Sequence, residues 1–311
     1  MSLLKFEDER QAKMMNTRSL TRFLVVSALC GASNGFAPLT APTKSVSIAA
    51  SQSPSSLNVF NPFARKEDIV EEVIVKEDPV PGPLDTKNYV AAAVWASLIG
   101  YAFLFAPGEL GSTSDNDLIA LLIAQPTPRP ESVNELFFAI WNCFAVIPIL
   151  IGALEAPVGR GQRLPAAPFL IGSAALGYFA LGPYFITRTV RTEPVDVKDL
   201  GFASKNIFES KIFAALVSAI AISIPFSSGL FACDPSTTLA GFSDLCSSST
   251  FVAVSCLDTA IISGLISVLV SEDATRRGWE DKSLPLLAAT LLLPVVGPSL
   301  YLLARPSLEQ E

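Results

Sequence analysis

The sequence contains no histidine, and this absence excludes several classes of function at once. Histidine-dependent zinc sites, His-ligated haem or chlorophyll, histidine-box di-iron oxygenases and Ser-His-Asp hydrolases all require an imidazole side chain. Glu, Asn, Gln or a backbone carbonyl could still ligate the magnesium of a pigment. Pigment binding is therefore weakened but stays open, and no cofactor is predicted.

Charged residues are also scarce, at 16% of the 311 residues, whereas a soluble domain carries about 25%. Hydrophobic residues reach 50%, and the mean hydropathy is +0.46. The net charge of −7 gives nucleic acid no electrostatic reason to bind. No Gly-rich phosphate loop follows a strand, and the apolar segments lack the E-x-x-x-x-R and E-x-x-N-x-R patterns of light-harvesting antennae. No nucleotide domain is therefore predicted, and the chain does not resemble the light-harvesting antenna family.

Long apolar segments follow residue 87 and predict an all-α, polytopic transmembrane helix bundle with about six spanning helices. Each has about 19–23 residues, enough to cross about 30 Å of hydrocarbon at about 1.5 Å per residue. The lipid bilayer is thus the first expected partner. A shorter apolar piece at 117–125 is expected to be interfacial or re-entrant. The six segments are 88–106, 135–154, 165–187, 212–230, 250–270 and 284–304.

The loops differ in basic content, which predicts their sidedness. Loops 188–211 and 271–283 carry several Lys and Arg, whereas loop 231–249 carries neither. The positive-inside tendency therefore places the two basic loops on the inner side of the membrane and 231–249 on the other side. Six spans would put both termini opposite the basic loops, but Lys76 and Lys87 of the N-terminal tail disagree with that placement.

The first 87 residues indicate a presequence and a tail. Residues 1–35 are expected to be a signal peptide, with translation starting at Met14 or Met15, because a basic stretch and a ten-residue apolar run follow those methionines. Residues 36–66 contain no Asp or Glu and are typical of a transit peptide. Residues 67–87 form an acidic, flexible tail, 88–306 the transmembrane domain and 307–311 a C-terminal tail.

The motif at 32–38, ASNGFAP, resembles the ASAFAP cleavage motif of bipartite plastid presequences in diatoms and related algae with secondary plastids. In that family a signal peptide precedes a transit peptide, and a phenylalanine, here Phe36, follows the cut. The resemblance implies a plastid membrane, and the thylakoid is expected rather than the inner envelope. An ordinary secretory signal followed by a linker is the alternative.

Asp258 is the main candidate for a functional side chain, because it lies near the middle of the fifth apolar segment. A carboxylate at mid-membrane costs about 2.5–3.5 kcal/mol on insertion scales, so it is expected to face other helices or a cavity. It either contacts a proton, an ion or a substrate, or accepts a hydrogen bond from Ser or Tyr of a neighbouring helix. Both interpretations stay open.

Two further features are candidates of lower weight. Glu272, Asp273, Arg276 and Arg277 form a charge cluster that is expected to be a solvated surface turn, since the signatures of magnesium-dependent prenyl and CDP-alcohol transferases are absent. Glu155 is expected to pair with an arginine of the loop that follows it, Arg160 or Arg163. No metal ligand or catalytic residue is predicted.

Two of the five cysteines lie in 231–249, the loop without basic residues. Cys233 and Cys246 are a candidate disulfide, which an oxidising lumen would permit, and two free thiols are the alternative.

Several stretches resemble uncharacterised multi-pass proteins of cyanobacteria and chloroplasts, which supports location and architecture but implies no activity. A fainter similarity exists to the plastid membrane family required for neoxanthin formation. The stretches are NELFFAIWN at 134–142, RGQRLPAAPF at 160–169, GPYF at 182–185, Asp258, EDATRR at 272–277 and LPVVGPSLYLLARP at 293–306.

Three functions are compatible with these observations. The leading hypothesis is a non-enzymatic accessory or biogenesis factor of a photosynthetic membrane complex in the thylakoid. The alternatives are an enzyme that acts on a carotenoid or lipid, and a transporter of a small solute or ion that uses Asp258.

Overall fold

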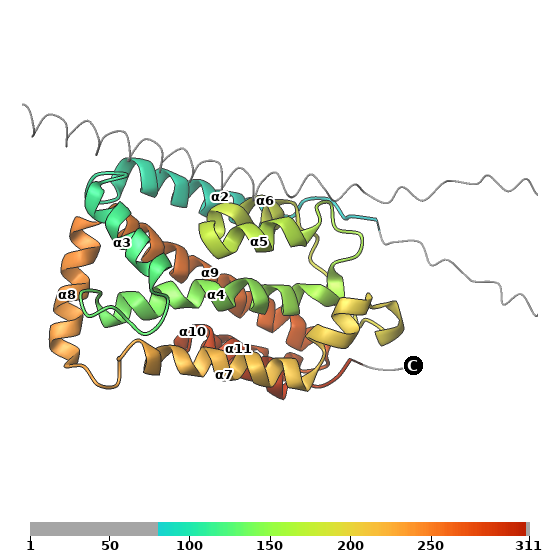
Figure 1. Cartoon of the computed structure of the whole chain (residues 1–311). Coiled ribbons are helices and arrows are strands. Elements are labelled where there is room, and N and C mark those ends of the chain that lie inside the picture. The colour runs from blue at the N-terminus through green and yellow to red at the C-terminus, as the bar shows by residue number, and fades with distance from the viewer. Residues whose placement is uncertain (1–79, 309–311) are drawn as a thin grey trace, which may run out of the picture. The chain divides into compact units, whose positions relative to one another are not determined.

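The computed structural model describes residues 80–308, and within them every regular element is a helix (Figure 1). The predicted signal peptide, the transit-like segment and most of the acidic tail lie outside the described residues. Three helices are long and apolar enough to cross a membrane: Thr86–Phe105, Glu135–Val158 and Thr250–Arg276. The all-α prediction is confirmed, and the chain has the helices of a membrane protein.

The helices follow one another in a simple order. Long or intermediate helices run along the bundle, and shorter ones cross it or fold back (Figure 1). The α-helices are α2 (Thr86–Gly100), α3 (Thr113–Ala124), α4 (Glu135–Glu155), α5 (Ala166–Leu176), α6 (Tyr178–Thr187), α7 (Lys211–Ser227), α8 (Pro235–Ser248), α9 (Thr250–Arg276), α10 (Ser283–Leu292) and α11 (Val296–Ala304). The π-helix η2 (Tyr101–Phe105) extends α2, and η5 (Ser204–Phe208) precedes α7.

The third predicted span, 165–187, is not one helix. Gly177, at φ 53° and ψ −132°, ends α5 and starts α6, which folds back against α5. The base of this hairpin is closed by Gln162, whose Nε2 donates to the carbonyl of Thr189 at 2.9 Å and whose Oε1 accepts from its N–H at 2.8 Å. At about 16 Å, neither arm can span a bilayer. The prediction of a continuous span is wrong here, because hydropathy does not detect a reversal at one glycine.

The last predicted span, 284–304, is a second hairpin. Helices α10 and α11 are separated by Leu293–Val295, and Val295 has φ 67°, a conformation that a β-branched residue rarely adopts. Its base is closed by Arg277, whose Nη1 donates to the carbonyl of Pro306 at 2.6 Å. Six continuous spans are therefore reduced to four helices that run along the bundle, α2, α4, α7 and α9, and two short hairpins.

The described chain consists of two halves with the same order of elements. Each half has a helix along the bundle, a short helix, a second helix along the bundle and a hairpin: α2, α3, α4, α5–α6 and then α7, α8, α9, α10–α11. The packing repeats as well. Helix α2 packs on α6 as α7 packs on α11, and α4 packs on α5 as α9 packs on α10.

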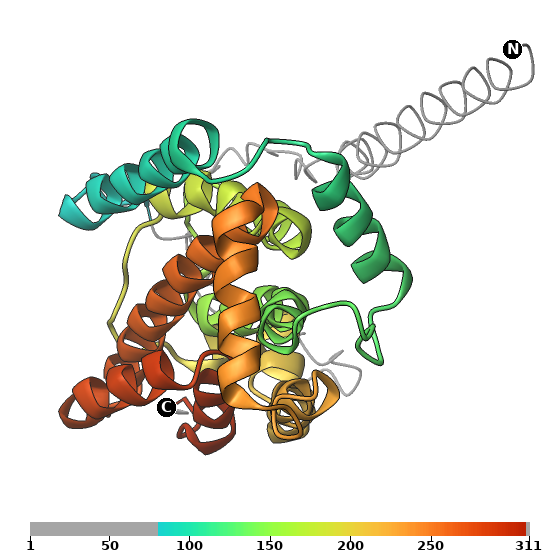
Figure 2. The ribbon, with the colours of Figure 1, turned by 90° about the vertical axis from the view of Figure 1, so that its left-hand side faces the viewer.

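The short helix of each half, α3 or α8, forms hydrogen bonds with a long helix of the other half. Asp115 of α3 accepts hydrogen bonds from the Ser249 hydroxyl at 2.5 Å and from the Phe251 N–H at 3.1 Å, and so caps the start of α9. Thr238 of α8 donates to Glu135 at 3.1 Å and accepts from Asn134 at 2.9 Å at the start of α4. Figure 2 shows this end of the bundle, with α8 running across it. These hydrogen bonds hold the halves together.

Residues 231–249, predicted as a loop, form α8 for most of their length, because Asp234 caps the helix and Pro235 occupies its first turn. Cys233 precedes α8, and Cys246 lies in its last turns. With at least about 16 Å of helix between them, their thiols cannot bond. Both are free, and the Sγ of Cys246 lies 3.8 Å from that of Cys256. The predicted Cys233–Cys246 disulfide is incompatible with this fold.

Replacing Gly177 with alanine should destabilise the protein more than any strain in the turn explains. The new Cβ would lie 1.7 Å from Oδ2 of Asp258. Gly111→Ala is the matched control, since Gly111 has φ 75° but no neighbour within 4 Å of such a Cβ. Backbone strain costs of order 1–3 kcal/mol in both variants. Thermal unfolding in detergent should rank Gly177→Ala well below Gly111→Ala, and equal losses would contradict the importance of the contact.

Candidate functional site

Asp258 lies on α9 where the turn of the α5–α6 hairpin reaches that helix. Its side chain is buried, at 4% exposure, and its Oδ1 accepts a hydrogen bond of 2.8 Å from the backbone N–H of Tyr178. Tyr178 is the first residue of α6, so the carboxylate faces the positive end of a helix dipole. A backbone N–H provides the hydrogen bond, whereas a Ser or Tyr hydroxyl was the predicted donor.

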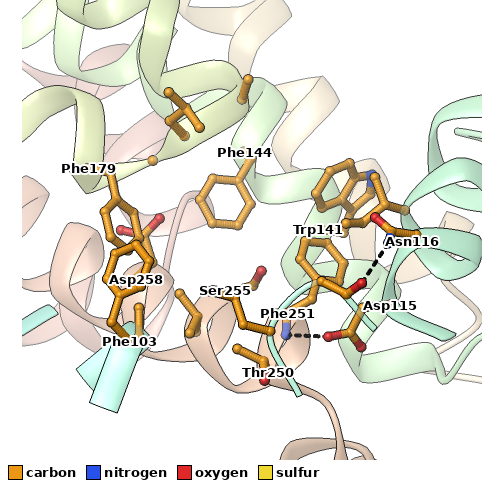
Figure 3. Close-up of a pocket in the computed structure, with 18 of the residues that line it drawn as sticks. Phe103, Asp115, Asn116, Trp141, Phe144, Phe179, Thr250, Phe251, Ser255 and Asp258 are labelled. Atoms are coloured by element: carbon orange, nitrogen blue, oxygen red, sulfur yellow. Dashed lines mark hydrogen bonds between the residues drawn. The ribbon is translucent and has the colours of Figure 1, made fainter. Parts of the chain in front are cut away.

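A pocket of about 410 Å³ opens beside Asp258 (Figure 3). It lies between η2, α3, α4, the hairpin turn and α9 and is predominantly apolar. Aromatic rings from four of these elements surround it, and Asp258 and Ser255 are polar groups on its α9 wall. The rings belong to Phe103, Trp141, Phe144, Phe179 and Phe251.

The pocket has the composition of a binding site for an apolar molecule with one polar group. Its volume is within the usual range for small-molecule sites, about 300–1,000 Å³. Asp258 could accept a hydrogen bond from a hydroxyl or hold a proton there. Among residues 80–308, no group of three His, Cys, Asp or Glu side chains could hold a metal ion. The mostly apolar lining favours binding through apolar contacts, with a hydrogen bond to Asp258.

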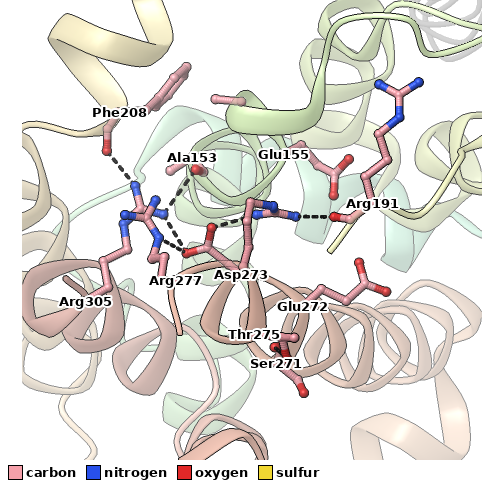
Figure 4. Close-up of polar contacts among 12 residues, drawn as sticks. Ala153, Glu155, Arg191, Phe208, Ser271, Glu272, Asp273, Thr275, Arg277 and Arg305 are labelled. Carbon is pink, nitrogen blue, oxygen red and sulfur yellow. Dashed lines mark hydrogen bonds and ion pairs between the residues drawn. The ribbon is translucent and has the colours of Figure 1, made fainter. Parts of the chain in front are cut away.

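A second polar centre lies at the opposite end of α9 (Figure 4). Asp273 is fully buried and pairs with Arg276 at 2.8 Å, Arg277 at 2.8 Å and Arg305 at 3.0 Å. Glu209 accepts from Arg277 and Arg305, at 2.7 and 2.8 Å, which extends the network to the segment before α7. We call the end of the bundle that contains Asp273 the charged end.

The sequence prediction of a surface charge cluster was wrong in one respect. Glu272, Asp273, Arg276 and Arg277 do form ion pairs, but all four are buried, at 0–9% exposure. They were expected to be a solvated turn because no signature of a magnesium-dependent transferase surrounds them. Helix α9 instead continues through them, and α11 together with the segments around residues 191 and 209 covers them.

Glu155 pairs with a distant residue rather than with Arg160 or Arg163. Its two oxygens lie 2.8 Å from Nε and 2.7 Å from Nη2 of Arg188, which also reaches Glu272 at 2.7 Å. Burial disfavours charge on Arg188, but the two carboxylates outweigh this effect and raise the pKa of Arg188 above its usual value. Arg188 therefore stays charged and joins the end of α6 to α4 and α9.

The two hairpins are fastened by equivalent clamps, each made of an acid, a tyrosine and an arginine. In the first, Glu155 at the end of α4 accepts from the Tyr184 hydroxyl at 2.8 Å and from Arg188. In the second, Asp273 near the end of α9 accepts from the Tyr301 hydroxyl at 2.8 Å and from Arg305. Both pairs have the spacing Tyr-x-x-x-Arg and follow a Gly-Pro step, a repeated signal that the sequence analysis missed.

Searches against protein-family models, curated proteins and solved structures found no match for this chain.

Removing the central charge of the second clamp should destabilise the protein strongly. Asp273→Asn leaves the buried guanidinium groups of Arg276, Arg277 and Arg305 without their shared carboxylate, which typically costs about 3–5 kcal/mol. Lys198→Gln is the control, because Lys198 pairs with Asp196 at 3.6 Å while 71% exposed, and such pairs contribute at most about 1 kcal/mol. Thermal unfolding in detergent measures both. Similar stability of the two variants would contradict the clamp.

Proposed function

We propose that this protein is a plastid membrane protein that binds a lipid-soluble molecule beside Asp258 and serves as a non-enzymatic accessory or biogenesis factor of a photosynthetic membrane complex. The observation that carries the binding role is the aromatic pocket of about 410 Å³ with a carboxylate at the hairpin turn. An isoprenoid ring with a hydroxyl group, as in a carotenoid, matches that chemistry. The presequence motif at 32–38 supports the plastid address, with the thylakoid preferred.

The arrangement in the membrane follows from the two hairpins. With α2, α4, α7 and α9 crossing the bilayer and both hairpins entering from the charged end, every Lys and Arg of residues 80–308 except Arg129 belongs to that end. That asymmetry matches the positive-inside tendency and assigns the charged end to the stroma. It also removes the conflict over Lys87, because the start of α2 and the end of α11 then share the basic side. Buried backbone in a re-entrant hairpin is acceptable at membrane depth when protein surrounds it.

The number of crossings can be tested with epitope tags. Four crossings predict that a tag after Thr192 and a tag at the C-terminus lie on the same side of the membrane, and that a tag after Gly111 lies on the other. Six continuous spans would place the tags after Thr192 and at the C-terminus on opposite sides. Protease protection in sealed vesicles measures sidedness, with the Gly111 tag as the internal control.

The binding role predicts what accompanies the protein out of the membrane. After gentle solubilisation, the native-gel band should be larger than the free protein, and mass spectrometry of that band should find a carotenoid or lipid. Ala175→Phe would fill the pocket and should lower the bound ligand about tenfold, a loss of about 1.4 kcal/mol. Ile171→Phe on the same helix, at a position 73% exposed, is the control.

Migration only as free protein would contradict the accessory role, and an unchanged ligand content in Ala175→Phe would contradict the binding site. If Asp258→Asn instead left the protein abundant but caused a chemical precursor of the ligand to accumulate, the protein would be an enzyme.

A transport function is a second candidate because of the hairpins. Discontinuous helices whose N-termini meet a polar group inside the membrane are typical of secondary transporters, and α6 begins in this way at Asp258. The repeated halves are a further feature of such proteins. pH-dependent solute flux in reconstituted vesicles that Asp258→Asn abolishes would favour transport over binding.

A further inference from the structure

A groove separate from the Asp258 pocket runs between α2 and α9, with a volume of about 570 Å³. Apolar side chains form most of its walls, and Gly264 lies in its α9 wall with no atom within 4 Å of where a Cβ would stand. Tyr178 and Phe185 of α6 also line it, and the apolar residues on its two long walls include Val90, Ala91 and Val94 of α2 and Ile261, Leu265 and Val268 of α9.

One end of the groove is polar and lies at the charged end. There, Lys87 Nζ lies 3.3 Å from one oxygen of Glu272, and Arg188 lies 2.7 Å from the other. Arg188 also pairs with Glu155, so these two cations face two carboxylates and the local charge is balanced. Lys87 is 59% exposed and Asn88 is buried beside it. The groove therefore has a polar end at the charged end of the bundle and apolar walls along the rest of its length.

The corresponding place in the other half is packed more closely. Helix α7 is the counterpart of α2, and α4 is the counterpart of α9. Helix α7 packs along α4 more extensively than α2 packs along α9. In α2 only Asn88 and Leu98 are buried, and Val90 has 56% of its surface exposed. The groove thus arises where the repeat is broken, and it leaves apolar surface of α2 and α9 without a protein partner in this part of the chain.

We infer that the groove is a binding site for a membrane lipid, with an acyl chain between α2 and α9 and an uncharged or zwitterionic headgroup at Lys87 and Glu272. Residues 261–269 provide about 12 Å of apolar wall, which suits an extended chain. The balanced charges offer hydrogen-bond donors and acceptors but no net attraction for an anionic headgroup. The groove and the Asp258 pocket have no lining residue in common, although α6 and α9 contribute to both, so the lipid site does not depend on the proposed function.

Filling the groove tests the inference. Gly264→Leu places a side chain in the empty space, and Gly100→Leu is the matched control, since Gly100 is also helical, has no neighbour within 4 Å and lies outside the groove. The full chain is reconstituted in vesicles of equal parts phosphatidylcholine, digalactosyldiacylglycerol and phosphatidylglycerol, and retained lipids are counted by native mass spectrometry. Wild type and Gly100→Leu should retain one neutral or zwitterionic lipid, and Gly264→Leu about tenfold less.

Equal retention by Gly264→Leu and Gly100→Leu would overturn the site. Preferred retention of phosphatidylglycerol by the wild type would overturn the headgroup assignment. If Gly264→Leu unfolds at a lower temperature than Gly100→Leu, Val268→Phe replaces it with the same expected result, because Val268 lines the groove and is already 42% exposed. The ligand of the Asp258 pocket should remain bound in all these variants, which separates a failure here from a failure of the proposed function.

Discussion

The buried carboxylate of Asp273 is the contact on which the charged end depends. It accepts a hydrogen bond from the Tyr301 hydroxyl and forms ion pairs with three arginines, and it is fully buried. A carboxylate without these partners would be too costly to bury. Because its partners come from the end of α9 and the end of α11, the pairing fixes where the second hairpin must finish. Glu155 does the same for the first hairpin with Tyr184 and Arg188.

This constraint explains why two short hairpins can be stable within an apolar bundle. Each hairpin has a clamped base, but the two tips make different contacts. The first turns at Gly177 and places the start of α6 on Asp258, whereas the second turns at Pro294 and Val295 without a comparable polar contact. The polar tip is also the one beside the aromatic pocket, so the difference between the halves coincides with the candidate site.

Comparison of the two repeated halves separates features that serve the fold from features that are specific to one half. Where both halves agree, in the clamps and in the hydrogen bonds that each short helix makes at the start of α4 or α9 in the other half, the features serve the fold. Where they disagree, at Asp258 and at the groove between α2 and α9, packing is incomplete and space remains. Incomplete packing is costly in a protein interior, so such places are the sites at which a ligand would stabilise the structure.

The sequence alone predicted the helical class and the position of most apolar helices, and it singled out Asp258 as a candidate, because hydropathy and a lone carboxylate in an apolar segment are local properties. It missed the reversals at Gly177 and Val295, because apolar windows do not distinguish one long helix from two that fold back. It also misjudged the Glu272–Arg277 stretch and the pairing of Glu155. Those outcomes depend on Arg188 and Arg305, which approach the acids only when the hairpins close. Burial and ion pairing across such distances are decided by tertiary structure, because a charge becomes tolerable in the interior only when its partners arrive from elsewhere in the chain.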